Sequence, residues 1–317
     1  MRPPRLGRIV IATAAATFLI WPAGPAPLAT AAPAHPSAPT GTARLAARIL
    51  SASTKACDPT ASLPTPPGPP IVTPGSYMQA IRARGYLLAG VDLSDYHLGY
   101  LNPANGHVEG FEIDILHAIS AAIFGNPNQI HYVGITDAER RPFVQSGRVD
   151  IVAHTMTVLC SRWQQVDFST VYLEAHQRIL VEDGSPIRGI SDLVGRKVCA
   201  TSTSTSLTYL QQHGAIPVKA YDWTDCLVKL QLGQVVAVST DDVILAGLAA
   251  QDPYTKIVGP PLTNEPYGLA ISKQHPDFVR YVNAVLAQMR ADGQWAATYR
   301  HWLGSPAPAP PSARYQA

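Results

Sequence analysis

Residues 197–250 decide the fold class, and they read KVCATSTSTSLTYLQQHGAIPVKAYDWTDCLVKLQLGQVVAVSTDDVILAGLAA. Three short apolar runs alternate there with three segments that carry a helical pattern. The runs are 197–200, 218–221 and 235–239, and the helical segments are 205–212, 224–232 and 243–250. Gly214 and Gly233 follow the first two helical segments, where glycine typically ends a helix. This alternation predicts an α/β fold with mostly parallel sheets covered by helices.

The same alternation extends over residues 77–303. Further strands are expected at 87–91, 130–133, 149–156, 177–181 and 267–271, and further helices at 112–124, 137–146, 276–290 and 294–303. Fifteen of the 29 prolines precede this part and four follow it, so it is the folded part of the chain. It carries 17 basic and 21 acidic residues, a net charge of −4, which argues against nucleic-acid binding.

The two ends of the chain differ from the folded part. Residues 1–31 combine three arginines, a 13-residue apolar run and small residues near their end, which is typical of an export signal. Residues 32–76 are expected to form a Pro/Ala-rich linker, and residues 304–317 a disordered tail. We therefore expect an exported, extracytoplasmic protein of the periplasm or cell envelope. The first cysteine, Cys57, lies too far from the apolar run for lipidation, which leaves an uncleaved N-terminal segment as the alternative anchor.

Four cysteines stand at positions 57, 160, 199 and 226, and no two of them have C-x-x-C spacing. An even number of cysteines in an exported chain favours two disulfides. The ten histidines include no H-E-x-x-H motif and no pair at metal-binding spacing on one helix. We expect neither a metal site nor a cofactor.

Polar clusters follow four of the expected strands. Asp92, Arg162 and Asp241 stand in three of them, and six hydroxyl residues at 201–206 form the fourth. Ligands bind at the carboxyl ends of parallel strands, so these groups are expected to meet. A guanidinium and hydroxyls at a helix N-terminus suit a carboxylate, and aspartates suit an ammonium, which together describe an α-amino acid. Taken singly, the hydroxyls could be helix caps and Arg162 a surface charge.

Signals for catalysis are weak. The chain has no G-x-S-x-G nucleophile elbow and no G-x-G-x-x-G fingerprint. Five carboxylates could serve as acids or bases: Asp92, Asp95, Glu109, Glu112 and Asp114. Two of these acids begin an expected helix, where the helix dipole favours them without any catalytic role. We therefore expect a protein that is not an enzyme.

A series of motifs resembles one known family. In chain order they are GFEIDI at 110–115, QSGRVDI at 145–151, TMT at 155–157 with Arg162 and VDFS at 166–169, DLVGRKV at 192–198, YGLAI at 267–271, and DG at 292–293 with YRHWLG at 299–304. Through them, residues 82–304 resemble the extracellular solute-binding proteins of polar amino acid ABC transporters. The resemblance is closest to actinobacterial glutamine- and glutamate-binding members.

The resemblance implies a two-lobe fold of the type II periplasmic-binding-protein kind. Lobe 1 would comprise residues 77–173 and 263–303, and lobe 2 residues 174–262, joined by two crossing strands that act as a hinge. A monomer would hold an amino acid between the lobes and deliver it to an ABC permease. The alternatives are a carrier that presents the amino acid to a signalling membrane receptor, and an enzyme similar to cyclohexadienyl or prephenate dehydratases.

The resemblance also assigns roles to residues at both ends of the ligand. Arg162 would bind the α-carboxylate, helped by Thr157 and by Ser204 and Thr205 in the hydroxyl-rich loop. Asp241 would bind the α-amino group.

Four further residues complete the expected site. The carbonyl of Thr155 would also accept from the amino group, Asp92 lies where the family often contacts the ligand side chain, and Tyr96 is expected to stack on the ligand. Arg140 falls about one turn into its expected helix, near the cleft. A second cation there predicts an acidic ligand, glutamate or aspartate ahead of their amides, although a solvated helix face is the plainer interpretation of Arg140.

The expected lobes also suggest how the cysteines pair. Cys199 and Cys226 would both lie in lobe 2, which predicts one disulfide between them. Cys160 would lie in lobe 1, which predicts a disulfide to Cys57 in the linker. The alternative is that Cys57 and Cys160 stay unpaired.

Overall fold

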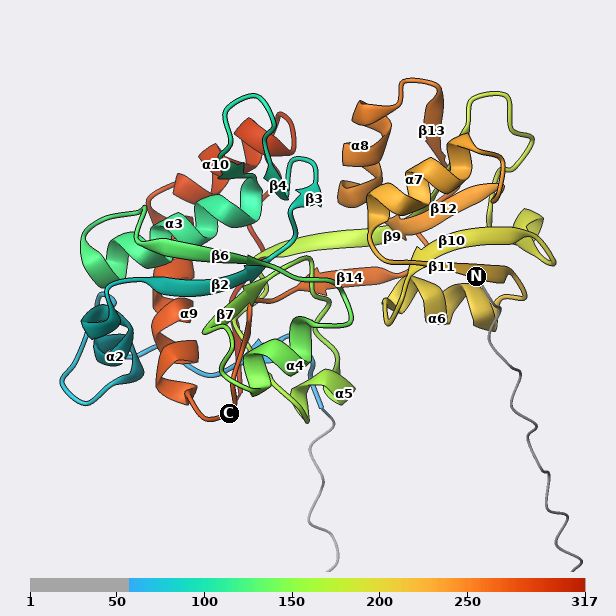
Figure 1. Ribbon diagram of the computed structural model, residues 1–317. Coiled ribbons are helices and arrows are strands. Elements are labelled where there is room, and N and C mark those ends of the chain that lie inside the picture. Colours follow the sequence, from blue (N-terminus) through green and yellow to red (C-terminus); the bar gives the residue numbers. More distant parts are fainter. Residues whose placement is uncertain (1–56, 317) are drawn as a thin grey trace, which may run out of the picture. The chain divides into compact units, whose positions relative to one another are not determined.

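The computed structural model describes residues 57–316 (Figure 1). The expected export signal at 1–31 and the first part of the expected linker, up to residue 56, lie outside the described residues. The described part contains two α/β lobes, each built around its own sheet, so the expected two-lobe fold is confirmed.

Lobe 1 is built on a five-stranded sheet in the order β6-β2-β7-β15-β8. Its strands are β2 (Leu87–Val91), β6 (Ile130–Gly134), β7 (Ile151–Ala153), β8 (Asp167–Phe168) and β15 (Ala270–Ile271). Its helices are α2 (Tyr77–Arg84), α3 (Phe111–Phe124), α4 (Arg140–Gln145), α5 (Cys160–Trp163), α9 (Pro276–Ala291) and α10 (Gln294–Trp302). A small sheet of β3 (Ser94–Asp95), β4 (Gly99–Leu101) and β5 (Val108–Glu109) extends this lobe beyond β2.

Helix α3 illustrates why the sequence folds in this way. Its face of isoleucines at 113, 115, 119 and 123 is fully buried, and Gly125 ends it in the left-handed conformation. Gly110, just before the helix, has φ 140°, and a Cβ there would lie 2.3 Å from the carbonyl oxygen of Leu98. Only glycine fits this position, which fixes where the small sheet meets the helix.

Lobe 2 is built on a mixed sheet in the order β11-β10-β12-β9-β13. Its strands are β9 (Leu173–Glu182), β10 (Lys197–Thr201), β11 (Ile216–Ala220), β12 (Ala237–Asp241) and β13 (Thr255–Val258). Its helices are α6 (Thr205–Gln212), α7 (Trp223–Gln231), α8 (Asp242–Gln251) and the 3-10 turn η1 (Ile190–Leu193). β10, β11 and β12 are parallel as the alternation predicts, whereas β9 and β13 run antiparallel to their neighbours.

Two strands from distant parts of the sequence connect the lobes. β9 leaves lobe 1 at Leu173 and continues as a central strand of lobe 2, and β14 (Asn264–Tyr267) returns beside it in antiparallel register, with Tyr267 opposite Leu173. Both strands cross between the lobes in Figure 1. Two antiparallel strands that pair with each other therefore form the connection between the lobes.

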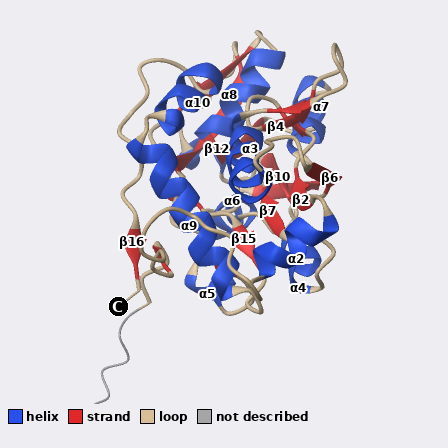
Figure 2. Ribbon diagram, turned by 90° about the vertical axis from the view of Figure 1, so that its left-hand side faces the viewer, coloured by secondary structure: helices blue, strands red, loops and turns tan. Residues whose placement is uncertain are grey.

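The segments expected to be a linker and a disordered tail differ from the prediction. β1 (Ala61–Ser62) and β16 (Arg314–Tyr315) form a parallel pair on lobe 1, and β16 is visible at the edge of the molecule in Figure 2. The hydroxyl of Ser62 is fully buried and donates to the carbonyl of Phe168, while the Asn283 amide donates to the same hydroxyl. The composition of these two segments did not indicate that they pack on lobe 1. A few specific hydrogen bonds, and not an apolar periodicity, hold them there.

The predicted disulfide pairing is confirmed. Cys57 bonds to Cys160, with Cα atoms 6.1 Å apart, and Cys199 bonds to Cys226, with Cα atoms 5.4 Å apart. The first bond fastens the N-terminal segment to α5, a helix of only four residues, and the indole of Trp163 in the same helix donates to the carbonyl of Pro59. Helix α5 is therefore positioned largely by a segment from outside the sheet.

We predict that replacing both Cys57 and Cys160 by serine lowers the free energy of unfolding by about 4–5 kcal/mol, because the bond closes a loop of about 100 residues. Hydrogen exchange followed by mass spectrometry should show the loss of protection concentrated in residues 57–63 and in α5. The control is the Cys199→Ser, Cys226→Ser variant, whose loss of protection should lie in lobe 2. Unchanged exchange at α5 in the first variant would contradict this role of the disulfide.

Candidate functional site

Seven of the predicted site residues line one narrow cavity between the lobes, with a volume of only about 10 Å³. Those from lobe 1 are Arg140, Thr155, Thr157 and Arg162, and those from lobe 2 are Ser204, Thr205 and Asp241. The rest of the wall consists of residues that the sequence analysis did not single out for the site: Asp137, Ser206, Trp223, Thr240 and Ile244. The polar clusters at the strand ends of the two sheets therefore lie on opposite walls of the same cavity.

Arg162 is a buried cation without an acidic partner. It lies in α5, is only 7% exposed, and donates from Nη1 to the carbonyl oxygen of Thr157 at 2.6 Å. Within residues 57–316, no carboxylate lies within ion-pair distance of it. Burial, reinforced by the nearby charge of Arg140, lowers the pKa of Arg162 to about 10, so the guanidinium is still protonated at neutral pH. Its remaining N–H groups suit an anion brought in by a ligand.

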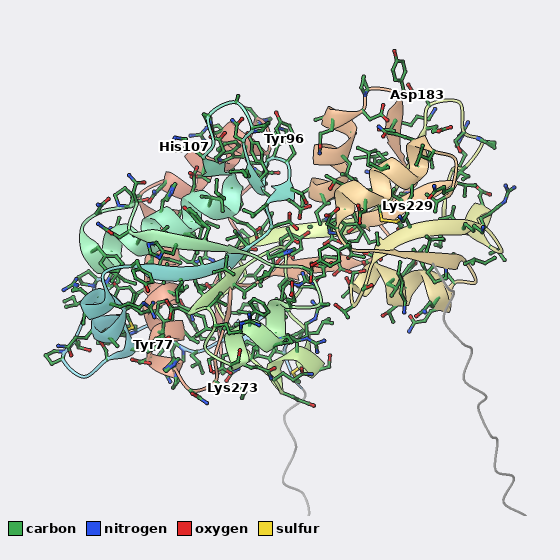
Figure 3. All side chains as sticks on the ribbon, viewed as in Figure 1. Tyr77, Tyr96, His107, Asp183, Lys229 and Lys273 are labelled. Carbon is green, nitrogen blue, oxygen red and sulfur yellow. A yellow bond between two sulfur atoms is a disulfide. The ribbon has the colours of Figure 1, made fainter. Side chains whose placement is uncertain are left out.

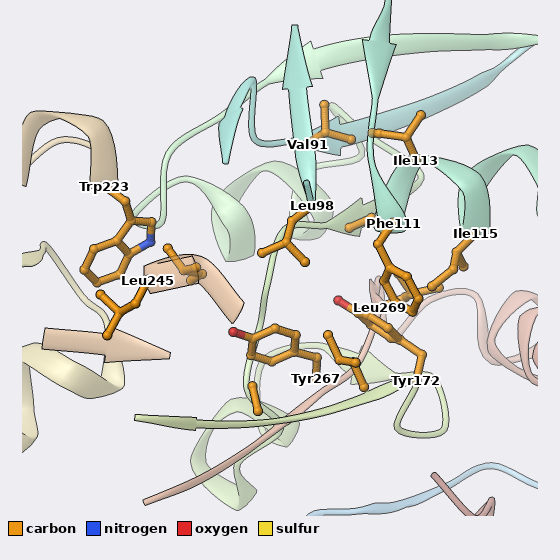
Figure 4. Packing of buried hydrophobic residues seen from close by; sticks show 14 of the residues in the cluster. Val91, Leu98, Phe111, Ile113, Ile115, Tyr172, Trp223, Leu245, Tyr267 and Leu269 are labelled. Carbon is orange, nitrogen blue, oxygen red and sulfur yellow. The ribbon is translucent and has the colours of Figure 1, made fainter. Parts of the chain in front are cut away.

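Asp241 is the matching acid on lobe 2. It ends β12, is 4% exposed, and accepts a hydrogen bond from the Tyr267 hydroxyl at 2.5 Å. Figure 4 shows that hydroxyl directed toward lobe 2. The other carboxylate oxygen, Oδ1, has no partner within the described part of the chain. Burial, with a smaller contribution from the charge of Glu265, raises the pKa of Asp241 well above its ordinary value, and a bound cation would remove this penalty.

Glu265 is a further acid at the site, on the returning strand β14. Its Oε2 accepts hydrogen bonds from the hydroxyls of Thr157 (2.6 Å) and Thr205 (3.0 Å), so one buried carboxylate joins the two lobes. The hydroxyl of Thr263 donates to its Oε1. The two threonines were expected to assist Arg162, but in the structure their hydroxyls are directed to Glu265. Sequence reasoning missed this acid because it looked at strand carboxyl ends and not at the crossing strands.

Arg140 lies in the cavity wall, but its charge is balanced. Its Nη1 lies 2.9 Å from Oδ1 of Asp137, and the same group donates to the carbonyl oxygens of His154 and Thr155. The hydroxyl of Thr201, in lobe 2, donates to the other oxygen of Asp137. Asp137 therefore neutralises Arg140 and also connects the lobes. The carbonyl of Thr155, expected to accept from a ligand, is already used by Arg140.

Thr155 has a strained backbone. Its φ is +44°, in the left-handed region that a β-branched residue rarely adopts. The Thr155 N–H donates to Oε1 of buried Glu112 at 2.8 Å, and the hydroxyl of Tyr172 donates to the same oxygen. Such strain typically persists only where the surroundings enforce it, and it is concentrated at functional sites.

Asp92 and Tyr96, the two remaining predicted residues, do not line the cavity. Oδ1 of Asp92 accepts the backbone N–H groups of Ser94 and Asp95, and its Oδ2 lies 3.2 Å from Nε2 of His154. Tyr96 lies on lobe 1 (Figure 3) with its backbone against Gly247 of α8. The aromatic side chain in the cavity wall is that of Trp223, which directly follows the N-cap of α7. A search for site residues just after the carboxyl end of β11, as was made for other strands, would have found Trp223.

Asp92, Asp95 and His154 bring possible metal ligands within 4.8 Å of one another. However, Nε2 of His154 lies 2.9 Å from the carbonyl oxygen of Ile135. A ring nitrogen that faces a carbonyl oxygen at this distance must carry the proton, so it has no lone pair for a metal ion. The geometry therefore does not favour Nε2 of His154 as a metal ligand.

The chain matches proteins of known type over most of its folded part. Residues 87–305 match the family described as bacterial extracellular solute-binding proteins, family 3. The ABC transporter glutamine-binding protein GlnH of Bacillus subtilis is 34% identical over 229 residues, which cover 71% of this chain and 84% of that protein. The glutamate-binding protein GluB of Corynebacterium efficiens is 30% identical, covering 73% of this chain and 83% of that protein.

Among solved structures, an ancestral arginine-binding protein bound to glutamine superimposes with a TM-score of 0.66 at 32% identity, covering 70% of this chain and 99% of that one. Both its fold and its sequence are therefore similar to this protein. Together with the family match, this shows that the chain belongs to the bacterial extracellular solute-binding proteins of family 3.

Proposed function

We propose that the protein binds a free α-amino acid between its lobes, with the α-carboxylate on Arg162 and the α-ammonium on Asp241. One observation carries this proposal: two buried groups of opposite charge face one cavity, one from each lobe, and neither has an ion-pair partner within the described residues. An isolated buried charge is costly, and a zwitterion would satisfy both charges together. Relatives named for glutamine, glutamate and arginine binding support a ligand of this class.

The same arrangement explains how a ligand would close the molecule. The cavity has walls from both lobes, and at about 10 Å³ it is too small to take an amino acid without a movement of one lobe. A ligand held by Arg162 in lobe 1 and Asp241 in lobe 2 makes its full set of contacts only when the lobes meet. We propose that the open form captures the amino acid and that rotation about β9 and β14 closes the cleft.

The charges around the cavity bear on the side chain of the ligand. The prediction of an acidic ligand rests on Arg140 as a second cation, and in the structure Asp137 neutralises that cation. Asp137 and Asp241 balance the two arginines in the cavity wall, and Glu265 lies directly behind Thr157 and Thr205 of that wall. We therefore propose an uncharged polar side chain ahead of an acidic one.

We further propose that the protein works outside the cytoplasm and delivers its ligand to an ABC permease. The signal-like N-terminus and two disulfides support export, because disulfides persist in oxidising compartments. Among residues 57–316, no helix is both long enough and apolar enough to cross a bilayer. Copurification from membranes with a permease subunit would support transport, whereas copurification with a signalling receptor would favour the sensor alternative.

We predict that Arg162→Ala weakens amino-acid binding at least 100-fold, because losing one partner of a buried ion pair costs about 3–5 kcal/mol. Asp241→Ala should do the same through the ammonium. Isothermal titration calorimetry measures both, and thermal unfolding checks that the variants fold. The control is Arg141→Ala, a neighbouring arginine whose side chain bonds to Gln165 on the surface. Affinity within about threefold of the unmodified protein in either cavity variant would rule out this site.

We also predict that affinity rises with pH. The pKa of Asp241 is raised in the free protein, and a bound ammonium would lower it, so ligand binding expels a proton. Affinity should therefore fall as pH is lowered from about 8 to about 5, where more of Asp241 is protonated before binding. Titrations in two buffers with different ionisation enthalpies should detect the released proton. Affinity that is independent of pH, with no proton release, would contradict an ion pair at Asp241.

A further inference from the structure

The buried cation of the site is carried by a very short element. Helix α5 runs only from Cys160 to Trp163, and Arg162 is one of its four residues. A single helical turn is not stable by itself, because it fixes several residues for few hydrogen bonds of its own. The direction in which the Arg162 guanidinium points therefore depends on what holds the two ends of α5.

The N-terminal segment, residues 57–64, holds α5 at both ends. Cys57 forms the disulfide with Cys160, the first residue of the helix. The indole of Trp163, the last residue, donates to the carbonyl oxygen of Pro59 at 2.8 Å. Lobe 1 adds a contact at this second end, where the ammonium of Lys273 donates to the carbonyl oxygen of Trp163 at 2.8 Å. The guanidinium of the site thus lies between two attachments to the N-terminal segment.

The N-terminal segment is itself fixed on lobe 1. The Ser62 hydroxyl donates to the carbonyl oxygen of Phe168 at 2.6 Å, and the Asn283 amide donates to both Ser62 Oγ and the carbonyl oxygen of Leu63. The segment can therefore act as a support for α5. It precedes residues 87–305, the range that matches the family, so this support is not part of the matched region.

The two disulfides differ in their exposure to solvent. Cys57 is exposed and Cys160 is partly exposed, whereas Cys199 and Cys226 are both 0% exposed. The rate at which a thiol reduces a disulfide depends on its access to the sulfur atoms. A mild reductant should therefore open the bond that holds α5 and leave the buried bond of lobe 2 intact.

We propose that the Cys57–Cys160 disulfide and Trp163 position Arg162 for the ligand, and that reduction of this disulfide lowers the affinity for the amino acid. A dithiol such as dithiothreitol supplies the two electrons. Its thiolate breaks the S–S bond, both cysteines end as thiols after taking up two protons, and the dithiol closes to its own cyclic disulfide. Once α5 is released at its first residue, the planar guanidinium is no longer held in the fixed geometry that pairs it with a carboxylate.

The inference rests on the proposed function, since its effect acts through the ion pair at Arg162. It is tested by calorimetric titration of the oxidised and the dithiothreitol-reduced protein with the tightest binder among glutamine, asparagine, glutamate and aspartate. Peptide mapping first shows that only the Cys57–Cys160 bond is open. We then expect the affinity of the reduced protein to be about tenfold lower.

Three variants accompany this comparison. Cys57→Ser combined with Cys160→Ser should show the same loss without reductant and no response to dithiothreitol. Trp163→Phe keeps a ring but lacks the indole N–H, and it should weaken binding by the oxidised protein about fivefold. The control is Arg280→Ala, which removes a hydrogen bond to the carbonyl oxygen of Pro64 in the same segment but away from α5. Its affinity should stay unchanged.

A double-mutant cycle separates positioning from a general loss of structure. Arg162→Lys keeps the charge but replaces the planar fork by a flexible point charge, so its weaker binding depends little on a fixed geometry. Reduction should therefore cost this variant less than about threefold in affinity. A full tenfold loss in Arg162→Lys would show that the disulfide acts on the lobe as a whole, and it would overturn the inference.

The remaining outcomes separate this inference from the proposed function. If no amino acid binds the oxidised protein, the proposed function fails and this inference fails with it. If amino acids bind through Arg162 with the same affinity before and after reduction, only this inference is overturned. Thermal unfolding shows whether each form is folded. If the reduced protein does not fold, the oxidised Trp163→Phe variant decides, and unchanged affinity in it overturns the inference.

Discussion

The structure depends on one electrostatic constraint: two opposite charges are buried on facing lobes without satisfying each other. Arg162 and Asp241 could each have been paired within its own lobe, as Arg140 is with Asp137. Leaving them unpaired lowers the stability of the closed, empty molecule, because neither charge recovers what it loses by leaving water. Under the proposed function, a zwitterion that enters the cavity would recover this deficit as binding free energy. A protein that must both capture and release its ligand benefits from such an arrangement.

The scaffold around these charges holds them rigidly, and by different means. Asp241 ends a central strand of lobe 2 and is fixed by Tyr267, which belongs to the returning strand β14. Arg162 lies on a single turn of helix that a disulfide and an indole hydrogen bond fasten to the N-terminal segment. Glu265 then connects the hydroxyls of both lobes at the hinge. The polar groups of the proposed ligand site are thus joined directly to the strands that connect the lobes.

Much of this could be predicted from the sequence, for identifiable reasons. The alternation of strands and helices, with glycines after the helices, predicted the fold class. Polar clusters at strand ends, the family resemblance and the helix position of Arg140 together predicted seven residues that line one cavity. Asp92 fell outside the cavity because its carboxylate caps the turn that follows β2. Asp137 and Glu265 were missed because their roles depend on partners far away in sequence, namely Thr201 and Thr205. The order of residues 57–76 and 304–316 was missed because proline-rich composition conceals specific hydrogen bonds.

The central claim is that a free amino acid bridges Arg162 and Asp241. A crystal structure of the protein grown with glutamine tests it most directly. The account predicts a ligand carboxylate within about 2.7–3.2 Å of the Arg162 guanidinium and an ammonium at the same distance from Asp241, with the lobes closed around them. A ligand bound elsewhere, or one that leaves either charge unpaired in a closed cleft, would contradict it.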